Sequence, residues 1–367
     1  MRILVYLGHP AHYHLFKHVV ASLESKGHHV QIVIKEKDVL RELLEEAGCP
    51  YQEVHERGPK RNKLDFAFNL FIRDIAVYKI AKKFKPQVML GTSAEIAHVG
   101  RILGIKSIVV NEDDYEVVPW FGRLAYPFAS FILAPSVCTV GRWTNKKISY
   151  EGYHELAYLH PNHFKPDEEV CSLLAPDGGR YFILRFAKLT AHHDEGRKGI
   201  SAEVAKSAIK LLEPHGRVYI SSERILEEEF EDYRIAIDPG LMHSALYFSS
   251  LYIGDSQTMA AEAAVLGTPS IRFNDFVGEI SYLEELEHRY GLTYGISTDN
   301  PDRLLRKIRV WLRQSDLDEE WQRRRNSMLN HKIDVAQFMS DLIESFGHPS
   351  DSQLVASDIN HAPQSHQ

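Results

Sequence analysis

Residues 254–269, GDSQTMAAEAAVLGTP, have the residue types and spacing most suggestive of chemistry in this chain. Asp255 and Ser256 can cap a helix, and the Ala-rich stretch after them ends at a glycine followed closely by a proline. A helix that begins after a buried strand exposes free N–H groups and the positive end of its dipole, which bind anions. Glu262 lies about one turn (roughly 5–6 Å) beyond Thr258, near the height of a ribose attached to a bound phosphate. The segment predicts either a nucleotide site or an ordinary buried crossover helix.

A cluster of histidines follows the first apolar run of the chain. Residues 8–14 read GHPAHYH, and this loop offers His9, His12, Tyr13 and His14 as bases or ligands. Histidine ionises near neutral pH, and the positive end of a helix dipole keeps a nearby imidazole neutral and able to accept a proton. We expect His12 to be a general base. The alternative is that these histidines cap or pack locally, and metal binding is disfavoured because no acidic residue shares their spacing.

A hydroxyl and three carboxylates follow two later strand candidates in the same half. Thr92 comes directly after Gly91, and Glu112-Asp113-Asp114 follows the next apolar run. Adjacent carboxylates repel one another unless water or a partner intervenes, so one of them can keep a raised pKa and act as acid or base. The candidate is one of Glu112, Asp113 and Asp114, and a solvated acidic turn is the alternative.

A basic segment follows an apolar strand candidate in the second half of the chain. It contains Arg185, Lys188 and His192. Fixed cations beside a diphosphate stabilise the charge that develops when the diphosphate leaves, and they do so without a metal ion. The segment therefore predicts metal-independent chemistry, with His192 as a further catalytic candidate. The alternative is a basic loop that its own acidic residues neutralise.

Strand and helix signals alternate along both halves of the chain. In the first half we predict strands at residues 3–7, 29–34, 88–90, 107–111 and 131–134, and helices at residues 15–25, 39–47, 65–84 and 94–103. In the second half we predict strands at residues 181–186, 217–220, 269–273 and 293–296 and an apolar run from residue 245 to residue 253, with helices at residues 201–212, 257–266, 283–290, 301–314 and 323–346. Such alternation builds parallel α/β sheets with helices on both faces.

Turn-forming residues interrupt this alternation between residues 150 and 167, which we interpret as a linker. We expect residues 1–160 to form an N-terminal Rossmann-like acceptor domain and residues 161–346 a C-terminal Rossmann-like nucleotide-sugar domain, whose end helix packs across both. Residues 347–367 are polar and predict a disordered tail. Open α/β sheets bind ligands at the carboxyl ends of their strands, so we expect the two domains to face a central cleft.

The composition is typical of a globular protein, since 44% of the 367 residues are hydrophobic and 25% are charged. A net charge of −7 argues against a general nucleic-acid binder. The cysteines are few and show no metal-ligand spacing, which suits reduced thiols. The first apolar run is too short for a signal peptide, and no run is long enough to cross a membrane, so we expect a cytoplasmic protein.

The order Asp-Ser, Glu, Ala, Gly and Pro in residues 254–269 resembles the nucleotide-sugar motif of GT-B proteins. It is most similar to that of the non-hydrolysing UDP-N-acetylglucosamine 2-epimerases and of the N-acetylglucosaminyl transferase of peptidoglycan synthesis. The resemblance implies that Ser256 and the helix N-terminus hold a diphosphate and that Glu262 binds ribose hydroxyls. It places Asp255 and Arg185 at the same nucleotide. The remaining residues implied at this site are Lys188, Gln257 and Thr258, where Gln257-Thr258 stands in place of a usual glycine pair.

Other segments resemble the epimerases in part. Thr190-Ala191-His192 is similar to their Thr-Ala-His-Arg segment. Glu112 corresponds to the Glu of their Val-Glu-Ala motif, which implies that Glu112 is the catalytic member of the three carboxylates. Thr92 stands where they have a catalytic Asp, which disfavours epimerisation. Across its whole length the chain looks like a family of prokaryotic GT-B-like proteins of unknown function.

The resemblance implies a metal-independent GT-B glycosyltransferase that uses a nucleotide-sugar donor, most consistent with a UDP-sugar, in surface polysaccharide or glycan synthesis. The donor is a substrate, and no cofactor is expected. The expected partners are this donor and a glycan or lipid-linked acceptor, with peripheral membrane contact and no nucleic acid. Two alternatives remain: an enzyme related to the 2-epimerases, or a protein that binds a nucleotide-sugar without catalysis.

Overall fold

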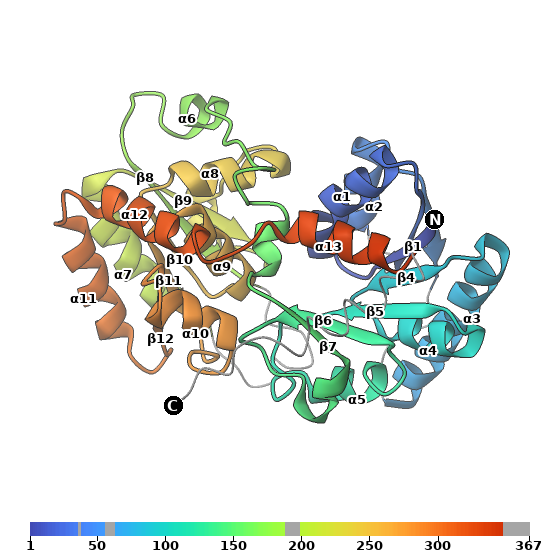
Figure 1. Cartoon of the computed structure of the whole chain (residues 1–367). Coiled ribbons are helices and arrows are strands. Elements are labelled where there is room, and N and C mark those ends of the chain that lie inside the picture. Colours follow the sequence, from blue (N-terminus) through green and yellow to red (C-terminus); the bar gives the residue numbers. More distant parts are fainter. Residues whose placement is uncertain (36–37, 56–62, 188–198, 348–367) are drawn as a thin grey trace. The chain divides into compact units, whose positions relative to one another are not determined.

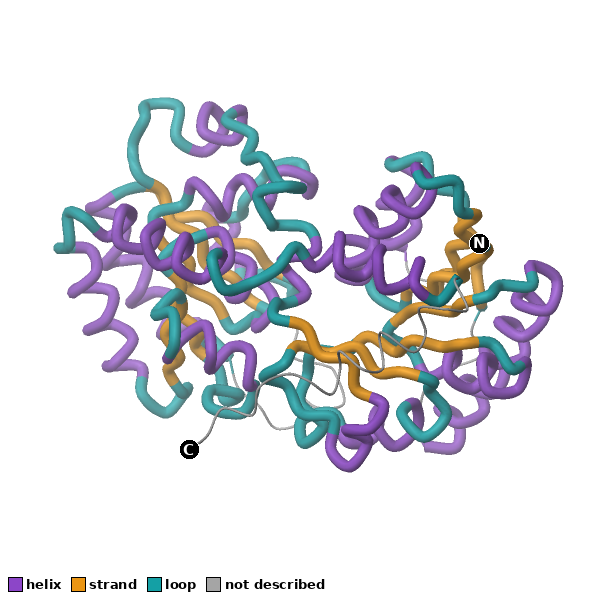
Figure 2. The backbone as a smooth tube through the Cα atoms, in the orientation of Figure 1, coloured by secondary structure: helices purple, strands orange, loops and turns teal. Residues whose placement is uncertain are grey.

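The computed structural model describes residues 1–35, 38–55, 63–187 and 199–347, which Figure 1 colours along the chain and Figure 2 colours by type of element. The chain forms two compact units. The first contains Met1–Tyr158 together with the segment that begins at Ile333, and the second contains Leu159–Lys332. Apart from Gly347, the expected disordered tail lies outside the described residues.

The first unit is built on a parallel sheet whose strand order, within the described residues, is β3-β2-β1-β4-β5-β6-β7. Its strands are β1 (Arg2–Leu7), β2 (His29–Lys35), β3 (Tyr51–Val54), β4 (Val88–Gly91), β5 (Lys106–Val110), β6 (Phe131–Pro135) and β7 (Lys147–Tyr150). Every neighbouring pair is parallel. The strand order reverses between β1 and β4, and such a reversal is where open α/β sheets bind ligands.

Helices cover both faces of this sheet. On one face α1 (Pro10–Ser25) contacts α2 (Asp38–Glu46) and α13 (Val335–Ser345), and on the other α4 (Ala94–Leu103) contacts α3 (Lys63–Phe84) and α5 (Pro119–Ala125) (Figure 1). This division follows from right-handed crossovers, because the chain first adds strands toward β3 and then returns to add strands toward β7. Two 3₁₀ helices, η1 (Gly141–Lys146) and η2 (His154–Ala157), complete the described part of the unit.

Sequence features explain the start of this unit. The apolar run Ile3–Leu7 is buried throughout, as expected for a parallel strand that is covered on both faces. His9 caps α1, and Pro10 occupies its first position, where the missing N–H costs nothing. Gly91 is required at the end of β4 because an added Cβ would lie 2.6 Å from the carbonyl oxygen of Tyr6.

The second unit contains a parallel sheet of order β12-β11-β10-β8-β9 in the part that the structure describes. Its strands are β8 (Tyr181–Phe186), β9 (Arg217–Ser222), β10 (Leu251–Gly254), β11 (Ser270–Phe273) and β12 (Thr293–Ile296). The α-helices are α6 (Glu169–Leu174), α7 (Ala202–Leu212), α8 (Met242–Phe248), α9 (Gln257–Leu266), α10 (Ser281–His288), α11 (Pro301–Leu312) and α12 (Leu317–Leu329). Short 3₁₀ segments are η3 (Glu213–His215), η4 (Glu228–Tyr233) and η5 (Pro239–Leu241).

The expected α/β class and most elements are confirmed, but several details differ. The sequence did not indicate β3, β7 or α6. The predicted helix over residues 323–346 is wrong: α12 ends at Leu329 and α13 begins at Val335, in the other unit. The apolar residues 245–248 belong to α8 rather than to a strand.

The segment predicted to be a linker is part of the first unit's core up to Tyr158. Its residues Tyr153, Leu156 and Ala157 are fully buried, and η2 packs against α1 and α13. The turn-forming residues therefore specify an irregular segment that is held by tertiary contacts. In the described residues no helix is both long and apolar enough to cross a membrane.

Candidate functional site

The first turn of α9 is an exposed, capped helix start at the carboxyl end of β10. The Ser256 hydroxyl accepts a hydrogen bond from the Met259 N–H at 3.3 Å, as an N-cap does. Ser256 and Gln257 are half-buried and Thr258 is exposed, whereas the rest of α9 is buried. The other N–H groups of a first helical turn have no acceptor within the helix and can bind an anion; anion binding here stays a prediction.

Glycine is needed where β10 meets this turn. A Cβ at Gly254 would lie 2.1 Å from the hydroxyl oxygen of the buried Tyr252 and 2.9 Å from the Cβ of Arg185. The same register pairs Gly254 with Arg185 on β8. Arg185, the predicted phosphate-binding cation, and the start of α9 are therefore adjacent at the carboxyl end of the second unit's sheet.

Glu262 lies farther along α9 and is largely buried. Its Oε1 atom is 3.1 Å from Nε2 of His243, a residue of α8. The ring of Phe164 packs edge-on against His243, with 6.3 Å between the ring centroids. His243 was not predicted as a site residue, because the apolar residues after it resemble a strand, whereas they belong to helix α8, which carries this side chain.

Arg185 forms a network with residues that follow β9. Its guanidinium donates to the Ser221 hydroxyl at 2.6 Å and forms an ion pair with Glu223. Glu223 is exposed, so the ion pair is accessible to solvent. An incoming diphosphate can compete with Glu223 for this cation. The other two predicted members of the basic segment, Lys188 and His192, lie outside the described residues.

Asp255 has a buried carboxylate that binds backbone. It accepts hydrogen bonds from the Ala187 N–H at 2.6 Å and from the Ile200 N–H at 3.0 Å. Burial raises the pKa of Asp255, although these two N–H donors oppose that shift. A Cβ at Gly199 would lie 2.2 Å from the carboxylate, so this contact also requires glycine. Asp255 therefore links the backbone that follows β8 to the backbone that leads into α7.

In the first unit His12 lies in the first turn of α1, and not in a loop as the sequence suggested. Its Nδ1 accepts a hydrogen bond from the Gly8 N–H at 3.1 Å. The Thr92 hydroxyl lies 2.7 Å from Nδ1 and 3.0 Å from Nε2. Because Gly8 occupies the Nδ1 lone pair, the neutral ring carries its proton on Nε2 and presents a donor there. His12 and Thr92 meet at the reversal point between β1 and β4.

Glu112 forms a second pair in the same unit. Its Oε2 accepts from the His154 backbone N–H at 3.0 Å, and its Oε1 is 3.3 Å from His154 Nδ1. Nε2 of His154 is buried and has no hydrogen-bond partner among the described residues. A carboxylate at Nδ1 fixes the tautomer that leaves a lone pair on Nε2, which is the arrangement of an oriented general base. The sequence singled out Glu112 and did not single out His154.

The three adjacent carboxylates after β5 are separated by their partners. Asp114 is buried and accepts from the Thr139 N–H at 2.7 Å, while Glu112 faces His154. This arrangement explains how the acidic turn avoids repulsion without being fully solvated. Glu112 is joined to an ionisable side chain, that of His154.

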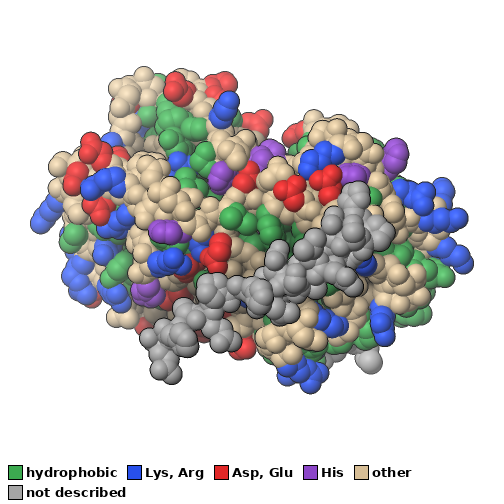
Figure 3. Space-filling view, in the orientation of Figure 1, with side chains coloured by type: hydrophobic (Ala, Val, Ile, Leu, Met, Phe, Trp, Pro, Cys, Tyr) green, Lys and Arg blue, Asp and Glu red, His purple; other side chains and the backbone are tan. Residues whose placement is uncertain are grey.

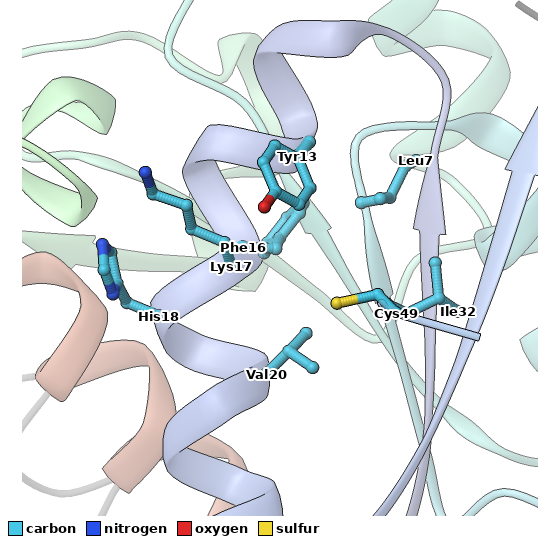
Figure 4. A pocket seen from close by; sticks show the side chains of 8 residues that line it. All are labelled: Leu7, Tyr13, Phe16, Lys17, His18, Val20, Ile32 and Cys49. Atoms are coloured by element: carbon cyan, nitrogen blue, oxygen red, sulfur yellow. The ribbon is translucent and has the colours of Figure 1, made fainter. Parts of the chain in front are cut away.

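A cavity of about 190 Å³ lies beside α1 in the first unit. Its lining, shown in Figure 4, consists of Leu7, Tyr13, Phe16, Lys17, His18, Val20, Ile32 and Cys49. The Tyr13 and Cys49 side chains point into it, whereas the polar ends of Lys17 and His18 point away. Burial raises the pKa of the Cys49 thiol, which makes it a poor nucleophile. The lining offers a nucleotide no cluster of cations, because the ammonium of Lys17 points away from the cavity.

The described residues contain no group of three His, Cys, Asp or Glu side chains arranged to hold a metal ion. Metal-independent chemistry remains a prediction.

Comparison with known families identifies the chain. Residues 1–279 match the family described as "Protein of unknown function (DUF354)". The chain belongs to this family. No curated protein matches the sequence.

Solved structures share the fold over nearly the whole chain. A putative UDP-N-acetylglucosamine 2-epimerase from Listeria monocytogenes has a TM-score of 0.69 at 14% identity, covering 95% of this chain and 96% of its own. The UDP-GlcNAc 2-epimerase from Neisseria meningitidis, bound to UDP-GlcNAc, has a TM-score of 0.65 at 14% identity. The match covers 94% of this chain and 99% of the epimerase chain. Spinosyn forosaminyltransferase has a TM-score of 0.64 at 13% identity, and the match covers 95% of this chain and 100% of the transferase chain. The chain has the GT-B fold.

Proposed function

We propose that this DUF354 protein is a glycosyltransferase that uses a nucleotide-sugar donor, with a UDP-sugar as the first choice, and transfers the sugar to a hydroxyl of a glycan or lipid-linked acceptor. The second unit binds the donor, and the first unit supplies the base. The GT-B fold is common to glycosyltransferases and epimerases, so the choice between them rests on the residues of the site.

The observation that carries the donor assignment is the exposed start of α9 with Arg185 beside it and Glu262 farther along the same helix. A diphosphate bound to the free N–H groups accepts hydrogen bonds from the backbone and interacts with the Arg185 guanidinium. The ribose then lies near Glu262, whose carboxylate accepts hydrogen bonds from two hydroxyls. His243 holds that carboxylate in place.

For the acceptor we propose that the Glu112–His154 pair supplies the general base and that His12 donates a hydrogen bond. The reason is the difference in tautomer: Nε2 of His154 keeps a lone pair, whereas Nε2 of His12 carries a proton. In the transfer step the acceptor oxygen bonds to the anomeric carbon and the bond from that carbon to the phosphate oxygen breaks. The acceptor proton passes to the base, and the nucleoside diphosphate leaves as an anion beside Arg185.

The hydroxyl of Thr92 disfavours the epimerase alternative. Removal of the C2 proton of a sugar needs a base, and a neutral hydroxyl bonded to His12 is a weak one. Glu112 is the observation that still supports epimerisation, since the epimerases have a Glu at the corresponding place.

The deciding experiment incubates the protein with UDP-sugars in the absence and presence of an acceptor panel, with a chelator added to each arm. We expect nucleoside diphosphate release that depends on an acceptor and survives the chelator. An epimerised donor formed without acceptor would instead support the epimerase alternative. Donor binding with no turnover in any arm would leave the non-catalytic alternative.

A further inference from the structure

Helix α3 of the first unit exposes a row of large apolar side chains. Phe68, Phe71 and Ile75 are 58%, 60% and 39% exposed. Their spacing of three and four residues places them on one side of the helix. Single exposed apolar residues are common on protein surfaces, but an aligned row on one helix face is a mark of an interaction site.

The same helix face continues as a cluster of cations. Lys79 lies four residues after Ile75, and Lys82 follows three residues later, so both continue the row, while Lys83 lies at its side. All three lysines are exposed. Figure 3 shows Lys and Arg side chains gathered on the part of the first unit where Figure 1 labels α3. This local positive charge contrasts with the net charge of −7 for the chain.

The opposite face of α3 is firmly packed. Val77 and Ala81 are fully buried in the core of the first unit. The buried Arg73 forms an ion pair with Glu95 of α4. The Asp74 carboxylate lies 3.0 Å from Nδ1 of His98, which also belongs to α4. The exposed row therefore belongs to a well-anchored helix, and its exposure does not result from loose packing.

The position of α3 relates this row to the proposed acceptor side. The helix follows β3, so its first turns, with Phe68 and Phe71, lie toward the carboxyl end of the sheet, and its lysines lie toward the other end. The first turn of α1 and the residues after β5 also lie at the carboxyl end. In the same helix layer, α5 exposes Trp120, whose ring is stacked by Arg123 at 5.3 Å.

We propose that the α3 face, defined as Phe68, Phe71, Ile75, Lys79, Lys82 and Lys83, docks on the surface of an anionic lipid bilayer. Aromatic side chains enter the boundary between headgroups and acyl chains, while the lysines remain at the level of the anionic headgroups. The interaction goes beyond the proposed function and holds whether or not a sugar is transferred. A bilayer is also where a lipid-linked acceptor would be found.

Charge and area favour a bilayer over a second copy of the chain. Three apolar side chains cover far less than the roughly 1,200–2,000 Å² that stable protein interfaces bury. The lysines that extend the row would meet no acidic cluster on an identical face, whereas phosphate headgroups complement them along the whole row.

The test is flotation of the full chain with vesicles of phosphatidylcholine alone and of phosphatidylcholine with phosphatidylglycerol. We expect binding to the anionic vesicles, weak binding to the neutral ones, and loss of binding as salt is raised. Phe68→Ser with Phe71→Ser should reduce the vesicle partition coefficient by about 10-fold or more, because each Phe loses its apolar transfer. Lys79→Glu with Lys82→Glu should abolish the preference for anionic vesicles.

Matched controls separate docking from unfolding and from self-association. Val310→Ser removes an apolar residue that is 56% exposed in the second unit, and it should leave flotation unchanged. Thermal unfolding of each α3 variant, followed by circular dichroism, should match that of the wild type and reports that both units are folded. The inference is overturned if the wild type does not float with anionic vesicles, or if the Phe variants float as well as the wild type. It is also overturned if light scattering shows a wild-type dimer that the Phe substitutions dissociate, since the row would then be a self-interface.

Discussion

At the residue scale, donor recognition in our proposal depends on the orientation of Glu262. The side chain is largely buried, and His243 Nε2 at 3.1 Å limits its rotation. A carboxylate fixed before the ligand arrives loses little conformational entropy when it binds a ribose.

Glu262→Ala should therefore weaken UDP binding by about 1.5–3 kcal/mol, the value of hydrogen bonds to a charged group. Isothermal titration calorimetry measures this change. His243→Gln keeps a donor for the carboxylate and should have a small effect, whereas His243→Phe removes it and should have an intermediate one. UDP affinity that is unchanged in Glu262→Ala would exclude this carboxylate from the ribose site.

The choice of base is a second question at this scale. We expect His154→Gln to lower kcat by about 10²–10⁴-fold, the usual contribution of general base catalysis. UDP affinity should be unchanged, because in our proposal the donor binds the other unit. Glu112→Gln should have a smaller effect of the same kind. His12→Gln keeps a hydrogen-bond donor and should retain much of the activity. If His12→Gln were inactive and His154→Gln active, His12 would be the base, as the sequence alone predicted.

At the element scale, α9 combines two roles at its first residue. Ser256 stabilises the helix by capping it, and the same turn presents free N–H groups to the proposed diphosphate. These roles are separable, because an N-cap can be replaced by a residue that caps equally well and carries a negative charge.

Ser256→Asp should keep the free energy of unfolding within about 0.5 kcal/mol of the wild type, since Asp is also a good N-cap. It should lower UDP affinity by 10-fold or more, because the added carboxylate repels the diphosphate. Ser256→Ala should behave differently and lose about 1 kcal/mol of stability. Denaturant unfolding and calorimetry measure the two quantities. Full UDP affinity in Ser256→Asp would place the diphosphate elsewhere.

At the scale of the whole molecule, the chain leaves the first unit after Tyr158 and returns to it at Ile333. The returning segment is anchored by a hydrogen bond from the Ile333 N–H to the Glu151 carbonyl at 2.8 Å. Helix α13 then packs on α1, and Glu344 forms an ion pair with Lys26. The first unit is therefore completed only when both ends of the chain are present.

A chain that ends at Lys332 should have a less stable first unit, because Met339 and the other buried residues of α13 lose their burial. Stabilisation by UDP, which we propose binds the second unit, should persist. Differential scanning calorimetry with and without UDP separates the two transitions. If the first unit of the shortened chain unfolded at the wild-type temperature, α13 would contribute nothing to the stability of that unit.

The same helix predicts a dependence on pH. Hydrogen bonds from Lys26 and His28 lower the pKa of Glu344 below its ordinary value of 4.5. A lowered carboxyl pKa contributes stability above the ordinary value, and this contribution is lost as the pH falls through the pKa of the folded state. Glu344→Gln should thus unfold at a lower denaturant concentration than the wild type at neutral pH. Below pH 4.5 the two unfolding midpoints should converge. A difference that persists unchanged in acid would exclude this ion pair as its cause.

The sequence by itself determined the α/β class, most strands and the capped start of α9. These features depend on local patterns: continuous apolar runs in buried parallel strands, an N-cap before an Ala-rich helix, and Gly267 in the left-handed conformation at its end. Gly254 and Glu262 belong to the same local motif, which is why the proposed donor site was visible before the structure.

Tertiary structure decided what depends on residues far apart in the chain. The partners of Glu262 and Glu112, which are His243 and His154, come from other elements, and no spacing in the sequence joins them. The strand β3 and the segment after β7 have weak local patterns and are ordered by burial against the rest of the first unit. The break between α12 and α13 is equally non-local, because the two helices belong to different units whose cores each bury one apolar face.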